Sequence, residues 1–208
     1  MAAPSLSQDE FRVLNYLDIY KFVYDVDFIK VGTCLDEGAV HKILESLKER
    51  GFVEEMEGTG IQITSKGEKA AEEYREAVLE RIGGREVLGE IYDKEFSKLN
   101  NKIKEVVTKW QMKIVSGNPV PNDHKDPEYD RAVIEELLKA HEKVRVLFAK
   151  LTEALPWYDQ YLKRLERAVS EIKAGNHSYV ADDTHSYHNV WYELHEDLLK
   201  LLKREREE

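Results

Sequence analysis

Two polar segments hold the residues that are best suited to chemistry. The first contains Asn122, Asp123 and His124, and the second covers residues 182–197 with the sequence DDTHSYHNVWYELHED. If the second segment is helical, one face carries positions i, i+3, i+4 and i+7, which are His188, Trp191, Tyr192 and His195. Such a face could bind a small ligand or a partner protein. It could equally pack inside a helical bundle, with the histidines hydrogen-bonded near the Asn122 loop.

The histidines also allow a metal site. His185 and His188 would lie one helical turn apart and could bind Zn²⁺ or Fe²⁺ together with a carboxylate. The chain lacks the His-Glu-x-x-His spacing of a zinc-binding helix, and its single cysteine, Cys34, excludes a thiolate cluster within one chain. We therefore predict neither a metal nor another cofactor.

Catalysis would require a nucleophile and a base that converge in one pocket. Only the Asn122 loop together with His185 and His188 offers candidates, and no glycine-rich phosphate loop is present. A role for His188 as a phosphoryl acceptor remains open. We expect a protein without catalytic activity of its own.

The N-terminal third has the pattern of three helices followed by a hairpin. A capping box of Ser7 and Glu10 precedes the first helix, and a short helix is predicted over residues 25–31, with Phe28 and Ile29 turned inward. The third helix carries Val40, Ile43, Leu44 and Leu47 at helical spacing and ends at Gly51. Two β-type runs, residues 52–56 and 61–64, then flank a Gly58-Thr59-Gly60 tip, and a further helix covers residues 67–81.

This order of elements resembles the winged helix-turn-helix regulators of the MarR and PadR families, from residue 7 to about 80. Residues 63–70, ITSKGEKA, look like the second wing strand and the start of the dimerisation helix in those families. The resemblance implies a third helix that enters the major groove of DNA, a wing that reaches the minor groove or the phosphates, and a homodimer.

The charges of this region oppose a DNA-binding role. Residues 1–67 contain seven lysines and arginines against twelve aspartates and glutamates, and the third helix opens with Asp36-Glu37. The wing adds Glu54, Glu55 and Glu57, without a lysine or arginine between Gly51 and Ser65. A local basic patch could still be formed by His41, Lys42, Lys48 and Lys66. DNA binding and protein contact through the wing both stay open.

Beyond Gly83-Gly84 the apolar residues continue at helical spacing and predict four amphipathic helices. The first runs to Ile114 and carries Lys94, Lys98, Lys102, Lys104, Lys109 and Lys113, which suit a solvated face or, alternatively, a polyanion surface. A polar loop, residues 116–127, separates it from helices that end near Pro156, Gly175 and Leu201. We predict a mainly α fold, with a winged helix-turn-helix domain over residues 5–82 and a four-helix region over residues 85–203.

A second resemblance covers the chain from Trp110 onward. The motifs NDHKDPEYD and SYHNVWYELHEDLL look like the helical region of winged-helix proteins that accompany enzymes resembling phosphoenolpyruvate synthase and pyruvate phosphate dikinase. The resemblance implies a regulatory or adaptor protein with a phosphotransferase as its partner. The alternative is a transcriptional regulator whose helical domain is the sensor and the dimer arm.

Composition limits where the protein works. The chain has 208 residues and a net charge of −10, and no apolar run approaches the roughly 20 residues of a membrane span. Its first residues lack the basic and apolar parts of a signal peptide, so we expect a cytoplasmic protein that does not contact membranes. We expect Cys34 to be a small buried residue before the third helix, with a redox sensor as the alternative.

Overall fold

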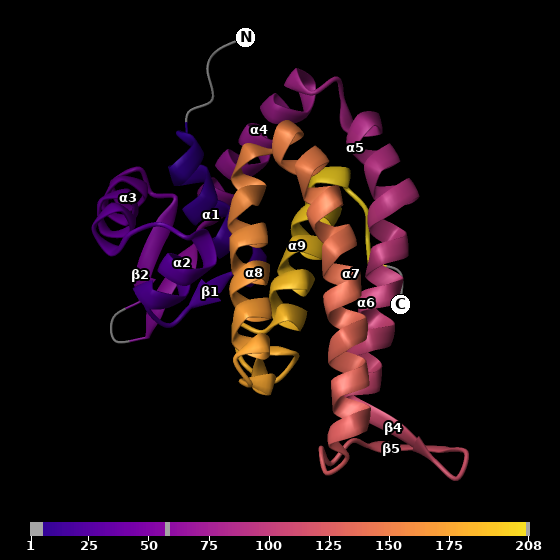
Figure 1. Ribbon diagram of the computed structural model, residues 1–208. Coiled ribbons are helices and arrows are strands. Elements are labelled where there is room, and N and C mark those ends of the chain that lie inside the picture. Colours follow the sequence, from indigo (N-terminus) through magenta and orange to yellow (C-terminus); the bar gives the residue numbers. More distant parts are fainter. Residues whose placement is uncertain (1–5, 57–58, 207–208) are drawn as a thin grey trace. The chain divides into compact units, whose positions relative to one another are not determined.

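The chain consists mainly of helices, and two small antiparallel sheets complete it (Figure 1). The computed structural model describes residues 6–56 and 59–206. Contacts between residues divide the chain into two units, of which the first combines residues up to Val87 with those from His195 onward, and the second is Leu88–Leu194. The mainly helical fold class predicted from the sequence is confirmed. The predicted break at Gly83-Gly84 lies close to Val87, and both glycines have positive φ angles, 94° and 105°.

Three helices begin the first unit, each with an acidic or hydroxyl side chain at its N-cap. They are α1 (Gln8–Tyr20), α2 (Val26–Thr33) and α3 (Glu37–Glu49). The predicted capping box is present, since the Glu10 amide donates to Ser7 Oγ at 3.2 Å and the Ser7 amide donates to Glu10 Oε2 at 2.8 Å. Asp25 and Asp36 cap the next two helices in the same way. All three helices were predicted from the sequence.

A three-stranded antiparallel sheet follows α3, with the strand order β1-β3-β2. Its strands are β1 (Phe22–Val23), β2 (Val53–Met56) and β3 (Gly60–Ile63). The predicted hairpin is therefore confirmed as β2–β3, and Gly51 takes the expected positive φ, 69°, after the helix. Glu57 and Gly58, which belong to the predicted tip, lie outside the described residues. The short strand β1 was not predicted, because two residues carry no periodic pattern.

The helix after the hairpin, α4 (Ser65–Arg81), packs against α1. Its Tyr74 ring stacks on Phe11 with 4.1 Å between ring centroids, and Thr64 caps its first turn by accepting from the Gly67 amide. A Cβ atom on Gly67 would lie 2.1 Å from the Phe52 carbonyl oxygen. Only glycine therefore allows α4 to begin so close to the hairpin.

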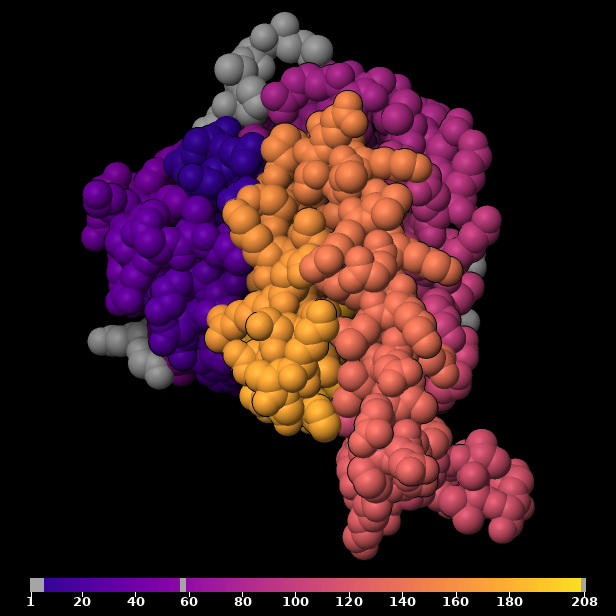
Figure 2. Space-filling model, viewed as in Figure 1, coloured from indigo at the N-terminus to yellow at the C-terminus, as the bar shows by residue number. Residues whose placement is uncertain are grey.

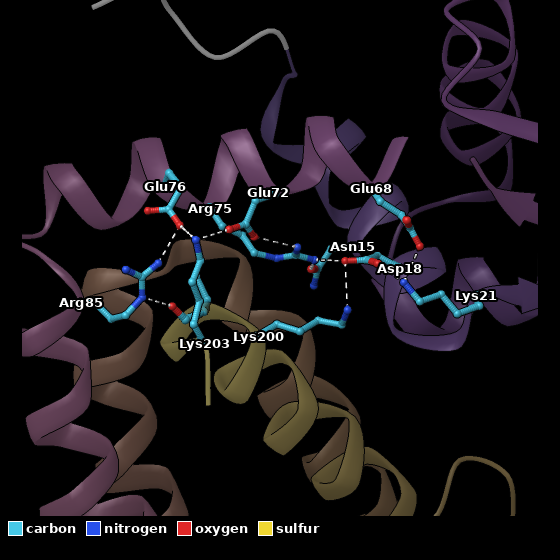
Figure 3. A network of polar contacts seen from close by, with 11 residues as sticks. Asn15, Asp18, Lys21, Glu68, Glu72, Arg75, Glu76, Arg85, Lys200 and Lys203 are labelled. Atoms are coloured by element: carbon cyan, nitrogen blue, oxygen red, sulfur yellow. Dashed lines mark hydrogen bonds and ion pairs between the residues drawn. The ribbon is translucent and has the colours of Figure 1, made fainter. Parts of the chain in front are cut away.

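Ion pairs hold the C-terminal end of α9 (Tyr187–Leu202) in the first unit (Figure 3). Lys203 Nζ lies 2.7 Å from Glu72 and 2.8 Å from Glu76, both on α4. Arg85, the first residue of α5 (Arg85–Ile91), donates to the Leu201 carbonyl oxygen at 2.8 Å. The residue after α9 therefore pairs with the acidic side chains of α4.

The second unit is built mainly from helices that enclose an apolar core. They include α6 (Ser97–Gln111), α7 (Pro127–Ala154), α8 (Asp159–Lys173) and the first part of α9, with the short turns η1 (Tyr92–Phe96), η2 (Pro156–Tyr158) and η3 (His177–Tyr179). Helix α6 packs along α7, and α7 packs against α8. Three side chains of α9 reach all three helices, since Trp191 contacts α6, Tyr187 contacts α7 and Glu193 contacts α8. These contacts bring α6, α7, α8 and the first part of α9 together in the second unit, which ends at Leu194, whereas the sequence placed the four-helix region over residues 85–203.

The prediction that the first of these helices continues to Ile114 is wrong. Helix α6 ends at Gln111, and the chain then forms a hairpin of β4 (Met112–Val115) and β5 (Asn118–Pro121) that projects beyond the helices (Figure 2). Ile114 is 69% exposed, so its apolar side chain is not part of the core. The Asn122 backbone amide donates to the Gln111 carbonyl at 2.8 Å and its side chain donates to the Trp110 carbonyl at 3.1 Å. These contacts terminate the helix at that point, and helical spacing alone does not reveal them.

Candidate functional site

The surface formed by α3 and the β2–β3 hairpin, hereafter the α3–hairpin surface, is the first candidate. A cavity of about 280 Å³ lies there. Val26, Leu44, Val53 and Ile61 supply its apolar lining, and its polar lining consists of His41, Glu45, Lys48, Glu54 and Glu55. Three carboxylates thus face two basic side chains, and the groove combines an apolar floor with an acidic rim.

Three of the four candidate DNA contacts are bound by this chain's own groups. Lys48 Nζ lies 2.7 Å from Glu55, and this hydrogen bond lowers the pKa of the Glu55 carboxyl. Lys66 donates to the Arg50 carbonyl oxygen at 2.7 Å, and His41 Nε2 lies 3.9 Å from Glu37. Lys42 is exposed and makes no ion pair within the part of the chain that the structure describes. Three of the four side chains therefore each lie close to an acceptor group of this chain.

The Asn122 loop forms a second cluster, at the base of the β4–β5 hairpin. Asp130 on α7 is buried and accepts from the Asn122 side chain at 2.8 Å, while its other oxygen lies 3.0 Å from His124 Nδ1. The His124 ring packs on the Trp110 ring with 4.3 Å between ring centroids. His177 packs edge-on against the same Trp110 ring, with 6.1 Å between the centroids. Asn122 and His124, two of the residues that the sequence suggested for a functional site, therefore lie in one cluster.

A carboxylate that holds one ring nitrogen of a histidine is the arrangement that orients an imidazole for proton transfer. Here, however, Asn122 also binds the Trp110 carbonyl oxygen, so the cluster closes the end of α6. Asp123 has a different partner. It pairs with Lys113 across the hairpin, and this hydrogen bond lowers the pKa of the Asp123 carboxyl. The cluster therefore fixes the hairpin to the helices.

The histidine and aromatic residues of α9 lie on one side of the helix but differ in burial. Trp191 is buried, donates from Nε1 to Asn100 Oδ1 at 3.0 Å and stacks on Phe96 at 5.1 Å. Tyr192 is 47% exposed, whereas His195 is buried and belongs to the first unit. All four residues lie on α9 at the predicted spacing, and they differ in burial, since Trp191 and His195 are buried whereas Tyr192 is exposed.

His185 and His188 were predicted one helical turn apart, and this prediction is wrong. Helix α9 begins at Tyr187, so His185 lies in the preceding turn, where its amide donates to Asp183. Burial, with a further contribution from Arg164, lowers the pKa of His185. The backbone amide of His188 donates to the Val180 carbonyl oxygen at 3.1 Å. Among the residues described, no group of three or more His, Cys, Asp or Glu side chains could hold a metal ion.

Cys34 is exposed, so the prediction of a small buried residue is wrong. It follows α2 with a φ angle of 56°, in the left-handed region. The turn between α2 and α3 directs this residue outward, although the flanking helices are amphipathic.

Two buried polar groups of the second unit were missed by the sequence analysis. His141 on α7 lies 3.1 Å from the Tyr187 hydroxyl and 3.3 Å from Glu166, and burial lowers its pKa. Arg164 makes a bidentate ion pair with Glu193 across α8 and α9. Each of these residues interrupts an apolar stripe of its helix, and such an interruption is the one signal that could have revealed them.

Comparison with known proteins adds no family to these observations. The chain matches no protein-family model, no curated protein and no solved structure. In the described part of the chain, no helix has both the length and the apolar composition needed to span a membrane.

Proposed function

We propose that this chain is a non-catalytic regulatory or adaptor protein, and that its N-terminal unit is a winged helix that docks a partner protein through the α3–hairpin surface. The ion pair between Lys48 and Glu55 carries this proposal. It joins the basic residue at the end of α3 to the first strand of the hairpin. A DNA phosphate would have to compete with a carboxylate of this same chain for that lysine.

The remaining charges of this surface support a protein partner over DNA. Glu45 and Glu54 also line the groove, and Asp36 and Glu37 occupy the start of α3. A helix that enters the major groove is surrounded by phosphates, and carboxylates at its N-terminal end repel them. The same carboxylates would attract a lysine- or arginine-bearing segment of a protein.

The apolar floor defines the second property of the partner. Leu44 and Ile61 lie beneath the acidic rim, so the complementary segment combines basic residues with apolar side chains that enter the groove. We propose that this segment belongs to a phosphoenolpyruvate-utilising phosphotransferase, the class of enzyme that the second resemblance implies. The helical unit would then act as a further docking or sensing domain.

One observation favours the alternative of a DNA-binding regulator. Lys42 is exposed on α3 and, within the described residues, makes no ion pair, while His41 beside it is 57% exposed. These two side chains could contact phosphates if α3 approached a duplex. Protein docking and DNA binding would both use α3, so a single variant can distinguish the two functions.

The proposed homodimer would also have to accommodate the C-terminal residues. In the resembled families the helix after the wing forms the dimer arm, and α4 here binds Lys203 through Glu72 and Glu76. Self-association therefore either uses other surfaces of the chain or displaces this segment. Sedimentation equilibrium of the full chain and of a Lys203→Glu variant tests these options, because displacement predicts stronger association of the variant.

The decisive variant is Glu55→Lys, which removes the partner of Lys48 and adds a positive charge to the groove. Fluorescence anisotropy would be measured with a labelled duplex and with a labelled peptide of alternating lysine and leucine, at about 50 and 200 mM salt. Protein docking predicts that the wild-type chain binds the peptide, that it does not bind the duplex, and that the variant loses the peptide. Glu49→Lys, an exposed position on α3 outside the groove, is the matched control.

The alternative predicts the opposite pattern. A DNA-binding protein would bind the duplex at low salt, and Glu55→Lys would strengthen this binding because Lys48 is released. Duplex binding by the wild-type chain that survives at about 200 mM salt would refute the docking proposal.

A further inference from the structure

A lysine-lined groove lies in the second unit, between α7 and the segment formed by η1 and α6. Its volume is about 830 Å³. Six lysines line it against two glutamates, Glu95 and Glu136, in a chain whose net charge is −10. The lysines are Lys94, Lys98, Lys102, Lys109, Lys139 and Lys143. The acidic chain thus concentrates positive charge in one groove.

Part of this charge is not used within the chain. Glu136 binds both Lys102, at 2.7 Å, and Lys109, at 3.0 Å. Lys98 and Lys143 are exposed and take part in no ion pair among the described residues. The groove therefore has two ammonium groups on opposite helices that are available to a ligand.

The floor of the groove is apolar. Leu99 on α6 and Ala140 and Leu147 on α7 line it, and Val146 beside them is 64% exposed. On α7 the residues Lys139, Lys143 and Val146 follow at i, i+4 and i+7, so the lysines and the apolar side chain form one stripe along the helix. A straight groove between two packed helices with this lining suits a third helix.

We propose that this groove binds an acidic amphipathic helix of a partner protein. Its carboxylates would pair with Lys98 and Lys143, and its apolar face would cover Val146 and Leu99. Nucleic acid fits less well, because the apolar floor offers its phosphates nothing, whereas the same floor can pack against the apolar face of a helix. The groove belongs to a different unit from the α3–hairpin surface and carries the opposite charge. Its function is therefore independent of the proposed docking by the N-terminal unit.

The probe is a fluorescein-labelled helix-forming peptide with glutamates on one face and leucines on the other. A matched peptide with glutamine in place of every glutamate and a labelled oligo-dT accompany it. Binding to the full chain is measured by anisotropy. Lys98→Glu combined with Lys143→Glu reverses the charge of the groove, and Val146→Ser removes its exposed apolar side chain. Lys104→Glu on α6, exposed and outside the groove, is the control for charge alone.

We expect the acidic peptide to bind the wild-type chain and the double variant to weaken this binding by about tenfold or more. Val146→Ser should weaken it as well, whereas Lys104→Glu should stay within about twofold of the wild type. Circular dichroism melting of each variant tests whether the fold is retained. We expect that it is, because the substituted side chains are exposed.

Three results would overturn the proposal. The glutamine peptide could bind as tightly as the acidic one, the double variant could bind as the wild type does, or oligo-dT could bind more tightly than the peptide and be lost in the double variant. The last result would assign the groove to single-stranded nucleic acid. None of them bears on the Glu55→Lys experiment, so the two proposals fail separately.

Discussion

The ion pair of Asp18 and Arg75 provides the sharpest test of how the first unit is held together (Figure 3). Asp18 Oδ2 lies 2.6 Å from Arg75 Nη2, and each side chain is only 4% exposed. Lys21 and Lys200 lie 2.6 Å and 3.2 Å from the same carboxylate. One carboxylate on α1 therefore joins α4 and the C-terminal end of α9. Replacing it with Asp18→Ala leaves Arg75 buried, with Asn15 and the partly exposed Glu72 as its remaining partners.

Removing one partner of a buried ion pair destabilises a protein by about 3–5 kcal/mol, because the other charge stays buried. We expect a loss within this range for Asp18→Ala, since Arg75 stays buried without its closest carboxylate, while the more exposed Lys21 keeps Glu68. Arg75→Met should cost about 1–3 kcal/mol, because Lys21 and Lys200 still neutralise Asp18. In the double variant Asp18→Ala with Arg75→Met no charge of this pair is left, and the loss should be smaller than for Asp18→Ala alone.

Thermal and urea unfolding, followed by circular dichroism, measure these differences. A loss of about 3–5 kcal/mol corresponds to a melting temperature lowered by roughly 6–20 °C for a chain of this size.

The same network should also make stability depend on pH. Burial acts to raise the pKa of Asp18, but Arg75, Lys21 and Lys200 together lower it below its ordinary value. The stabilisation is therefore complete above the pKa of an unfolded aspartate and is lost as the pH falls through the lower pKa of the folded state.

Two results would refute this reasoning. One is an Asp18→Ala variant that melts within about 2 °C of the wild type, because a buried guanidinium that has lost its closest carboxylate should destabilise the fold by more than that. The other is a double variant as unstable as the sum of its two single changes, since it would mean that the two side chains do not interact.

Four further outcomes are expected. Trp191→Ala should destabilise the second unit by about 3–5 kcal/mol, because the ring is buried against Phe96. His188→Ala should destabilise it by about 1 kcal/mol or less. Equal losses of stability in melting experiments would contradict the packing role of Trp191. Gly67→Ala should lower stability by about 1–3 kcal/mol, because the new Cβ would collide with the Phe52 carbonyl, and unchanged urea unfolding would contradict this. The exposed Cys34 thiol should react with Ellman's reagent in the native protein at a rate close to that in urea, and strong protection would show that it is covered.

The helices could be predicted from the sequence where local signals agree with packing. The Ser7–Glu10 capping box, the apolar spacing from Val40 to Leu47 and the positive φ of Gly51 all act within a few residues of one another. Ile114 shows the limit of such signals. Its spacing continues the stripe of α6, but Asn122, eleven residues beyond the end of the helix, binds the last carbonyls of α6 and ends it. A partner distant in the sequence leaves no trace in the local pattern.

The candidate sites were harder to predict, because their residues depend on tertiary contacts. The sequence suggested Lys48 as a DNA contact. Its ion pair with Glu55 forms only because the β2–β3 hairpin folds beside α3, and the local sequence does not show this. His188 and Trp191 share a helix, but which of its sides is buried depends on Phe96 and Asn100, about ninety residues earlier in the chain. The lysines of α6 were noted from the sequence as a solvated or polyanion-binding face, but α7 contributes the other wall of the groove and its floor.

The distribution of charge over the two units has a consequence for partners. A net charge of −10 would, if spread evenly, repel every acidic segment in solution. Here the carboxylates of the α3–hairpin surface and the lysines of the groove between α6 and α7 lie on different units, so under the two proposals each unit would bind segments of opposite charge. If one partner carries a basic and an acidic segment and can reach both sites, its second contact with the same chain is intramolecular, which raises the overall affinity. Such a partner should bind the full chain far more tightly than either peptide does, and Glu55→Lys and the lysine reversals should each remove most of that gain.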